Sequence, residues 1–151
     1  EQAVILASIV EREAPDNKED RKMVADILVQ RWKQGMKLEA DATTQYAVAL
    51  NHICPDSYLN CSPTTDELMI LNWWPDEITA EDLNSDSPYN TRKISGLPPA
   101  PISSISLGSL EAVINYKPTD YYFYLNDSNG IMHFAKTLEE HTKNIHTYMG
   151  Y

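Results

Sequence analysis

Glu11 is the side chain of this sequence that is best placed to act as a general acid. In a helix, Ala7 and Ser8 lie one turn before it and Val4 lies a further turn back, so its carboxylate continues a face of small and apolar residues. Burial on such a face raises the pKa of a carboxyl group and keeps it protonated, as general acid catalysis near neutral pH requires. The alternative is that Glu11 only marks where a buried helix emerges into solvent. Glu13 fits the neighbouring apolar face equally well, so helix geometry does not choose between the two carboxylates.

Asp41 is a second acidic residue of interest, and its surroundings are typical of a helix N-cap. An N-cap carboxylate accepts hydrogen bonds from backbone N–H groups, which lowers its pKa and makes it a poor acid. We therefore expect a structural role for Asp41, although it is also the second carboxylate that a hydrolytic glycosidase would need. His133 and His141 fall on a predicted strand and on the last predicted helix, where isolated histidines are more often packed or exposed than ligands.

Several kinds of site are excluded by what the sequence lacks. It contains no P-loop, no dinucleotide-binding fingerprint and no serine nucleophile elbow. His52, Cys54 and Cys61 do not supply four zinc ligands at the usual spacing, so we predict no metal and no cofactor. The two cysteines form a disulfide in an oxidising compartment or remain free thiols, and their spacing leaves both states open.

The charge balance argues against nucleic acid as a partner. Twelve Lys and Arg residues stand against 22 Asp and Glu residues, which gives a net charge of −10, and no basic stripe is present. The longest apolar runs, such as residues 3–10, are far shorter than the roughly 20 residues that span a bilayer. A length of 151 residues with 42% hydrophobic residues fits one domain. Because the chain begins at Glu1 without a start Met, we expect a domain excised from a longer protein.

Apolar periodicity and capping residues predict a series of helices and one β-hairpin. Helices are expected over residues 2–13, from Asp16 or Asn17 to Gly35, over 41–51 and 106–115, and from Thr137 onward. The hairpin is expected from strands 120–125 and 131–135 around a turn at 126–130. We therefore predict an α+β fold in which a small mixed or antiparallel sheet packs with helices in a two-layer, sandwich-like arrangement.

Two stretches without such patterns complete the predicted organisation. Residues 52–76 are rich in prolines and acids and predict a peripheral helical insertion, in which Trp73 or Trp74 covers apolar surface. Residues 87–104 carry four prolines but also aromatic and branched side chains, which predicts a long ordered loop. A loop of that length is usually functional.

A series of sequence blocks runs in a fixed order from the first predicted helix to the last. The blocks are LASIVERE at 6–13, QRWKQGMKLEADAT at 30–43, SPYNT at 87–91, GLPPAPIS at 96–103, PTDYYFY at 118–124, HF at 133–134 and EEHTKN at 139–144. In these blocks and in their order the chain resembles the endolytic murein transglycosylases, the MltG or YceG-like family.

The resemblance implies an enzyme that cleaves the MurNAc–GlcNAc β-1,4 bond within peptidoglycan strands without water. Its catalytic acid maps onto Glu11, which would protonate the glycosidic oxygen and then remove a proton from the C6 hydroxyl of MurNAc, leaving a 1,6-anhydro end. The substrate-binding residues implied by the matching blocks are Ser8, Asp41, Thr43, Tyr46, Tyr89, Asn90, Thr91, His133, Glu140, His141 and Asn144. For Asn90 the alternative is turn chemistry, in which the side chain bonds only nearby backbone.

The resemblance also places this chain within a larger protein. It implies one catalytic domain over residues 1–151, at the extracytoplasmic face of the bacterial cell membrane, with a membrane anchor and a LysM-like lobe that nothing in this chain matches. The expected partners are peptidoglycan strands and cell-wall synthases such as penicillin-binding proteins. Two alternatives remain open at this stage: a muramidase-type hydrolase, and a non-catalytic glycan-binding or scaffold module.

Overall fold

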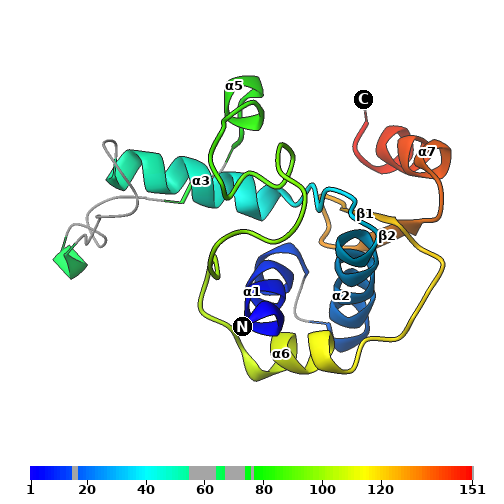
Figure 1. Ribbon diagram of the computed structural model, residues 1–151. Coiled ribbons are helices and arrows are strands. Elements are labelled where there is room, and N and C mark those ends of the chain that lie inside the picture. The colour runs from blue at the N-terminus through cyan, green and yellow to red at the C-terminus, as the bar shows by residue number, and fades with distance from the viewer. Residues whose placement is uncertain (15–16, 55–63, 67–73, 76, 151) are drawn as a thin grey trace.

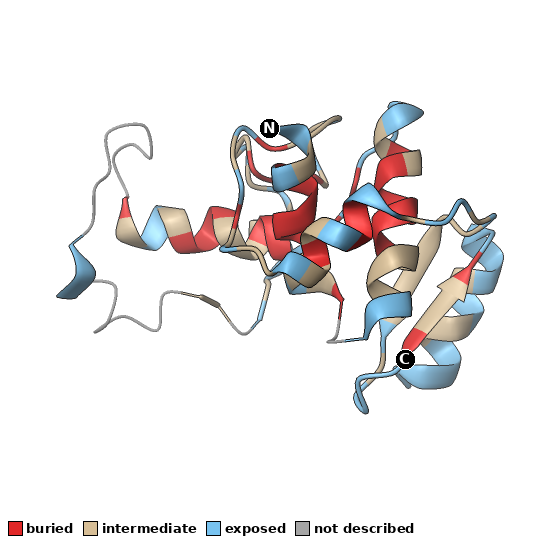
Figure 2. Cartoon of the chain, turned by 90° about the horizontal axis from the view of Figure 1, so that it is seen from below, coloured by how far each residue is buried: buried red, intermediate tan, exposed pale blue. Residues whose placement is uncertain are grey.

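The interior of the protein is built around α1 (Gln2–Glu13), which is buried along most of its length. The computed structural model describes residues 1–14, 17–54, 64–66, 74–75 and 77–150. In Figure 1, α1 lies beside α2 (Lys18–Lys33), and α6 (Leu107–Ile114) crosses below both helices. A helix that is apolar nearly all round must be covered on all sides, and Figure 2 shows buried residues concentrated on these elements. The predicted helix over residues 2–13 is therefore confirmed, and it lies at the centre of the core.

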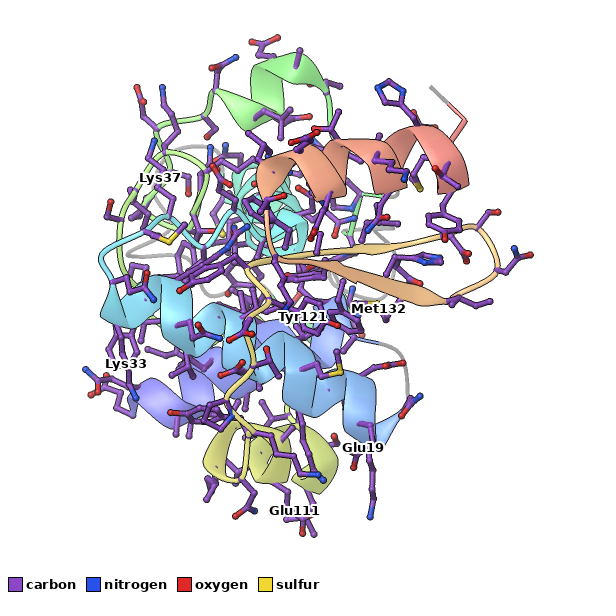
Figure 3. All side chains as sticks on the ribbon, turned by 90° about the vertical axis from the view of Figure 1, so that its right-hand side faces the viewer. Glu19, Lys33, Lys37, Glu111, Tyr121 and Met132 are labelled. Carbon is purple, nitrogen blue, oxygen red and sulfur yellow. The ribbon has the colours of Figure 1, made fainter. Side chains whose placement is uncertain are left out.

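A two-stranded antiparallel sheet forms the second part of the structure. It pairs β1 (Phe123–Asn126) with β2 (Met132–Ala135), with Phe123 opposite Ala135. Figure 3 shows this hairpin between α2 on one side and α7 (Leu138–Tyr148) on the other. The α+β class is confirmed, and in the part of the chain that the structure describes the sheet is purely antiparallel rather than mixed.

Three of the described helices, α2, α6 and α7, begin at a capping residue where the sequence predicts a helix start. The side chain of Asn17 accepts a hydrogen bond from the N–H of Glu19 at the start of α2, and Gly35, with φ of +70°, follows the end of that helix. Ser106 and Thr137 cap α6 and α7 in the same way. These short-range signals succeed because both partners of each bond are only a few residues apart.

The third helix, α3 (Asp41–Ile53), departs from its prediction at the first residue. Its N-cap is Ala40, so Asp41 lies in the first helical turn and the prediction of an Asp41 cap is wrong. Figure 1 shows α3 running from the centre of the molecule toward its left edge. The short helix α5 (Ala80–Leu83) follows, with a capping box between Thr79 and Asp82.

Much of the predicted insertion at 52–76, including Trp73, lies outside the described residues. Trp74 does pack against the hydrophobic core, as expected, and the guanidinium of Arg12 lies 3.8 Å from the centre of its ring. Cys54 is disulfide-bonded; Cys61, the only other cysteine of the sequence, is not among the described residues. Among the helices that the structure describes, none has the length and apolar character that a membrane span requires.

Candidate active site

Glu11 is engaged in holding α6 in place. Its Oε2 accepts hydrogen bonds from the backbone N–H of Ser106 at 2.9 Å and from the Ser106 hydroxyl at 2.6 Å. Its Oε1 lies 3.6 Å from a guanidinium nitrogen of Arg21. Desolvation raises the pKa of Glu11, but the bonds from Ser106 and the charge of Arg21 outweigh it, and the pKa lies below the ordinary value for glutamate. The prediction of a raised pKa at Glu11 is therefore wrong, because these partners stabilise the charged form.

Glu11→Ala is expected to lower the free energy of unfolding by about 1–3 kcal/mol, because the N–H and hydroxyl of Ser106 lose a charged acceptor. Urea unfolding of the full protein measures this change. Glu19→Ala is the control, since its carboxylate pairs with Lys22 on the exposed surface of α2, and it should leave the unfolding midpoint in place. An equal unfolding midpoint for both variants would contradict the structural role of Glu11.

Glu13 lies two residues further along α1 and points into different surroundings. Its Oε1 accepts a hydrogen bond from the backbone N–H of Ala42, in the first turn of α3, at 2.8 Å. Its Oε2 accepts a hydrogen bond from the hydroxyl of Tyr124, on β1, at 3.0 Å. Two elements far apart in the sequence therefore fix both carboxyl oxygens of Glu13.

Burial raises the pKa of Glu13, and the negative charge of Asp41 adds to that shift. The bonds from Ala42 and Tyr124 and the charge of Arg92 act in the opposite direction but do not cancel it. Burial and the neighbouring Glu13 also raise the pKa of Tyr124 well above its ordinary value, so its hydroxyl stays neutral. Glu13 thus has the property that the helix pattern predicts for Glu11: a carboxyl group that binds its proton more tightly than usual.

A cavity of about 510 Å³ opens beside Glu13, between the N-terminal end of α3, the hairpin and α7. Charged side chains from several segments line it together with apolar side chains, most of which come from β1 and α7. The charged residues are Glu13, Arg31, Glu39, Asp41 and Arg92, and the apolar ones include Phe123, Leu138, Ile145 and Met149. A pocket that combines an apolar wall with a few convergent polar groups suits an amphipathic ligand such as a sugar ring.

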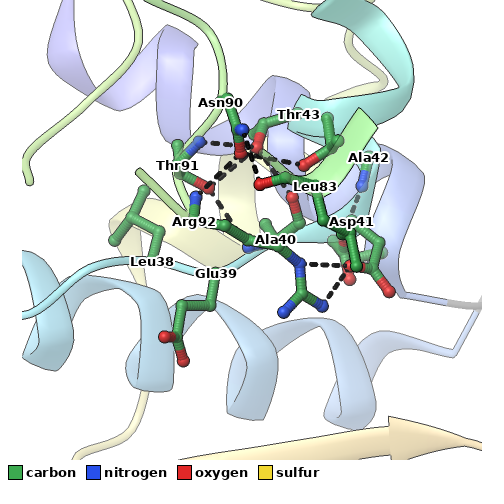
Figure 4. Close-up of polar contacts among 12 residues, drawn as sticks. Leu38, Glu39, Ala40, Asp41, Ala42, Thr43, Leu83, Asn90, Thr91 and Arg92 are labelled. Atoms are coloured by element: carbon green, nitrogen blue, oxygen red, sulfur yellow. Dashed lines mark hydrogen bonds and ion pairs between the residues drawn. The ribbon is translucent and has the colours of Figure 1, made fainter. Parts of the chain in front are cut away.

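Asp41 pairs with Arg92 in the lining of this cavity. Arg92 donates a hydrogen bond from Nε to Oδ1 of Asp41 at 2.9 Å, and its Nη2 completes the ion pair (Figure 4). Asp41 directly precedes Ala42, whose N–H binds Glu13, so the pair sits next to the candidate acid. The predicted substrate-binding residue Asp41 is therefore placed at the cavity, but its carboxylate is occupied by an arginine.

The predicted ligands Tyr89, Asn90 and Thr91 are buried, as is Thr43. The Asn90 side chain makes four bonds: Oδ1 accepts from the hydroxyl of Thr44 and the N–H of Arg92, and Nδ2 donates to two carbonyls of residues 83 and 85 (Figure 4).

The hydroxyls of Thr91 and Thr43 bond each other at 2.7 Å. Thr91 also accepts a hydrogen bond from the N–H of Ala40, where α3 begins. Asn90 and Thr91 have no exposed surface, which favours the turn chemistry that the sequence left open for Asn90 over direct contact with a glycan. Asn90 and Thr91 fasten the long loop to the start of α3, and so help place Ala42 against Glu13.

Ser8 is also enclosed and links α1 to the long loop. Its hydroxyl accepts a hydrogen bond from the N–H of Ile102 at 2.9 Å and donates one to the carbonyl of Ile5, so it is unavailable to a ligand. Tyr46 is different, because it lines a second open cavity of about 710 Å³ together with Glu11 and Trp74. Of the predicted site residues, Glu11 and Tyr46 line this second cavity, whereas Asp41 and His141 line the cavity beside Glu13.

The histidine-containing segment contributes one residue to the Glu13 cavity. His141 lines it and stacks on Phe123, and desolvation, followed by the charge of Arg31, lowers the pKa of His141 so that it is neutral near pH 7. His133 instead bonds Asp127 at 3.0 Å, outside the cavity.

Two further predicted residues hold α7 against the hairpin. Oε2 of Glu140 accepts a hydrogen bond from the N–H of Lys136 at 2.8 Å. Nδ2 of Asn144 donates to the carbonyl of Phe134 at 3.5 Å. These contacts give Glu140 and Asn144 a positioning function for α7, which carries His141 into the cavity.

No pattern in the sequence indicates that Tyr124 and Arg92 are neighbours of the candidate acid. Tyr124 lies 111 residues from Glu13, and Arg92 lies 51 residues from Asp41, so no local pattern connects them. The described residues contain no group of three potential metal ligands, and we assign no metal to the site.

Comparison with known proteins gives consistent matches over nearly the whole chain. The model of the YceG-like family matches residues 1–147. The endolytic murein transglycosylase of Bacillus subtilis (strain 168) is 36% identical over 138 residues, which cover 91% of this chain and 32% of that protein. The endolytic murein transglycosylase of Streptococcus pneumoniae serotype 2 (strain D39) is 31% identical over 93% of this chain and 22% of its own length.

A crystal structure of a yceG-like protein from Listeria monocytogenes matches with a TM-score of 0.69 and 35% identity, over 91% of this chain and 38% of that one. The chain thus spans about a third or less of the length of the two transglycosylases it matches. Both the sequence match and the fold agree with the ordered blocks found in the sequence. The chain belongs to the YceG-like family.

Proposed function

We propose that this chain is the catalytic domain of a lytic transglycosylase that cleaves the MurNAc–GlcNAc β-1,4 bond within peptidoglycan strands, with Glu13 as its acid. The observation that carries the proposal is a carboxyl group with a raised pKa, fixed at both oxygens, at the edge of a cavity suited to a sugar. The names of the Bacillus and Streptococcus relatives support the substrate class. We assign the role of catalytic acid to Glu13 and not to Glu11, because the carboxylate of Glu11 is bound to Ser106 and Arg21.

The hydrogen bonds of Glu13 favour one of its two oxygens as the carrier of the proton. The fixed N–H of Ala42 favours Oε1 as the carbonyl oxygen, so the proton resides on Oε2 beside the Tyr124 hydroxyl. That hydroxyl accepts a bond from the acid form and donates one to the carboxylate, and it therefore suits both states of Glu13. The same side chain is thus able to give a proton and later take one back.

Cleavage proceeds in two proton transfers through Glu13. Oε2 gives its proton to the glycosidic oxygen as the bond from C1 of MurNAc to O4 of GlcNAc breaks. The Glu13 carboxylate then removes the proton of the C6 hydroxyl of MurNAc, and the C6 oxygen forms the new bond to C1. The products are a GlcNAc 4-hydroxyl and a 1,6-anhydro-MurNAc end, and Glu13 is protonated again.

This reaction needs one carboxylate because no water has to be activated. Asp41 is the nearest second carboxylate in the cavity, and its ion pair with Arg92 argues against its use as the base of a hydrolase. The muramidase alternative is therefore less favoured, and the polar, accessible cavity at Glu13 argues against a purely non-catalytic scaffold.

The proposed substrate also implies a cellular setting. Peptidoglycan strands lie outside the bacterial cell membrane, so we place the full protein at the extracytoplasmic face of that membrane. Cell-wall synthases such as penicillin-binding proteins are the partners that produce these strands, and termination or trimming of nascent glycan is the proposed result of cleavage. We further propose residues 1–151 as one catalytic domain within a longer membrane-anchored protein.

Digestion of purified sacculi by the full protein, followed by mass analysis of the released fragments, tests the proposed reaction. Anhydro-MurNAc ends are 18 Da lighter than reducing MurNAc ends, because no water is added across the bond. We expect anhydro ends within strands. Reducing ends would indicate a muramidase, and undigested sacculi that nevertheless bind the protein would indicate a binding module.

A further inference from the structure

We propose that Asp41 and Arg92 act as an opposed pair of positioning residues that sets how tightly Glu13 holds its proton. The proposal rests on the proposed function only for its consequence in catalysis, since the contacts themselves are present in the structure. Neither Asp41 nor Arg92 transfers a proton in the proposed reaction. They act on Glu13 because they lie beside it and have charges of opposite sign.

A short series of covalent and hydrogen bonds connects Glu13 to Asp41 and Arg92. Glu13 Oε1 accepts the N–H of Ala42, the residue that directly follows Asp41 in the first turn of α3. Arg92 Nε donates to Oδ1 of Asp41 at 2.9 Å, and Glu13, Asp41 and Arg92 all line the same cavity. The side chains of Arg92 and Asp41 are 36% and 57% exposed, so solvent screens part of each charge, and a change in either acts on the Glu13 carboxyl group more weakly than a buried charge would.

The other charged and titratable groups around Glu13 come from every neighbouring element. They are Tyr124 on β1, Arg31 on α2, Glu39 on the segment before α3, and His141 on α7. Tyr124 and His141 are neutral near pH 7, and Arg31 bonds the carbonyls of Tyr122 and Leu38 and pairs with Glu39. Asp41 and Arg92 are thus the pair of this cavity whose charges oppose each other directly beside the Glu13–Ala42 bond.

The signs of the two effects follow from the charges. Asp41 disfavours a second negative charge nearby and raises the pKa of Glu13, whereas Arg92 favours that charge and lowers it. Asp41→Asn removes the first effect and frees Arg92 from its partner, so the pKa of Glu13 should fall. Arg92→Gln removes the second effect and leaves Asp41 uncompensated, so the pKa should rise.

The experiment measures the titration of the Glu13 side-chain carboxyl by carbon-13 NMR in the full protein, with the signal assigned from its loss in Glu13→Gln. We expect shifts of roughly half to one pH unit, downward for Asp41→Asn and upward for Arg92→Gln. The double variant should titrate near the unaltered protein. Lys93→Ala is the matched control, because Lys93 pairs with the exposed Asp86 and is not among the residues that line the cavity, and it should produce no shift.

The pH–rate profile of glycan cleavage gives the second measurement. Because the proton must be present before the bond breaks, the alkaline limb should move to lower pH in Asp41→Asn and to higher pH in Arg92→Gln. Shifts in the same direction for both variants, or none in either, would overturn the proposal. If the two variants shift the pKa of Glu13 in opposite directions but the protein does not cleave glycan, the role of the Asp41–Arg92 pair is supported and the proposed function is refuted. If the protein cleaves glycan but neither variant shifts the pKa of Glu13, the proposed function is supported and the role of the pair is refuted.

Discussion

Replacement of Glu13 by glutamine is expected to reduce the rate of glycan cleavage by about 10²–10⁴-fold, equivalent to about 3–5 kcal/mol of barrier. Glutamine keeps the shape of the side chain and the acceptor for the N–H of Ala42, but it has no proton to transfer. The rate of release of anhydro-muropeptides from sacculi measures the effect. The unfolding midpoint should change little, because the Tyr124 hydroxyl retains a polar partner.

Glu11→Gln is the matched control for this experiment, since it makes the same chemical change two residues away on the same helix. It should weaken the contacts to Ser106 and Arg21 and so lower stability, while the folded protein continues to cleave glycan. We thus expect Glu13→Gln to lose glycan cleavage and keep its stability, and Glu11→Gln to lose stability and keep glycan cleavage. Normal cleavage by Glu13→Gln together with loss of cleavage in folded Glu11→Gln would return the acid assignment to Glu11.

Asn90→Ala is expected to lower the free energy of unfolding by about 2–5 kcal/mol, the largest stability effect that the site predicts. Its side chain is fully buried and makes four hydrogen bonds, and alanine would leave two carbonyls, a hydroxyl and an N–H without this partner. Chemical denaturation of the full protein measures the loss. At temperatures where the variant is folded, KM for glycan should be unchanged, because Asn90 has no exposed surface.

Asn84→Ala provides the comparison within the same segment. Asn84 is exposed, and its side chain donates one hydrogen bond to the carbonyl of Ala80, so its loss should change stability by no more than about 0.5 kcal/mol. If Asn90→Ala instead kept its stability and raised KM, Asn90 would be a glycan ligand, as the sequence blocks first implied.

The family and most of the secondary structure were determined by the sequence alone. Helix caps such as Asn17 and Thr137 were predictable because each cap bonds an N–H two or three residues away. The hairpin was predictable from alternating aromatic and branched residues around a turn, and the ordered blocks located the family. All of these are signals in which the interacting residues are close together in the chain or follow one another in a fixed order.

Only the tertiary structure decided which carboxylate stands in a suitable environment for an acid. Glu11 and Glu13 lie about 200° apart around one helix, and each has apolar residues on its own helix face, so local patterns do not distinguish the two carboxylates. Ser106, 95 residues away, stabilises the charged form of Glu11, whereas burial against α3 and Tyr124, 111 residues away, favours the protonated form of Glu13. A carboxyl group's pKa depends on what is packed against it, and for these two residues those partners are brought together only by the fold.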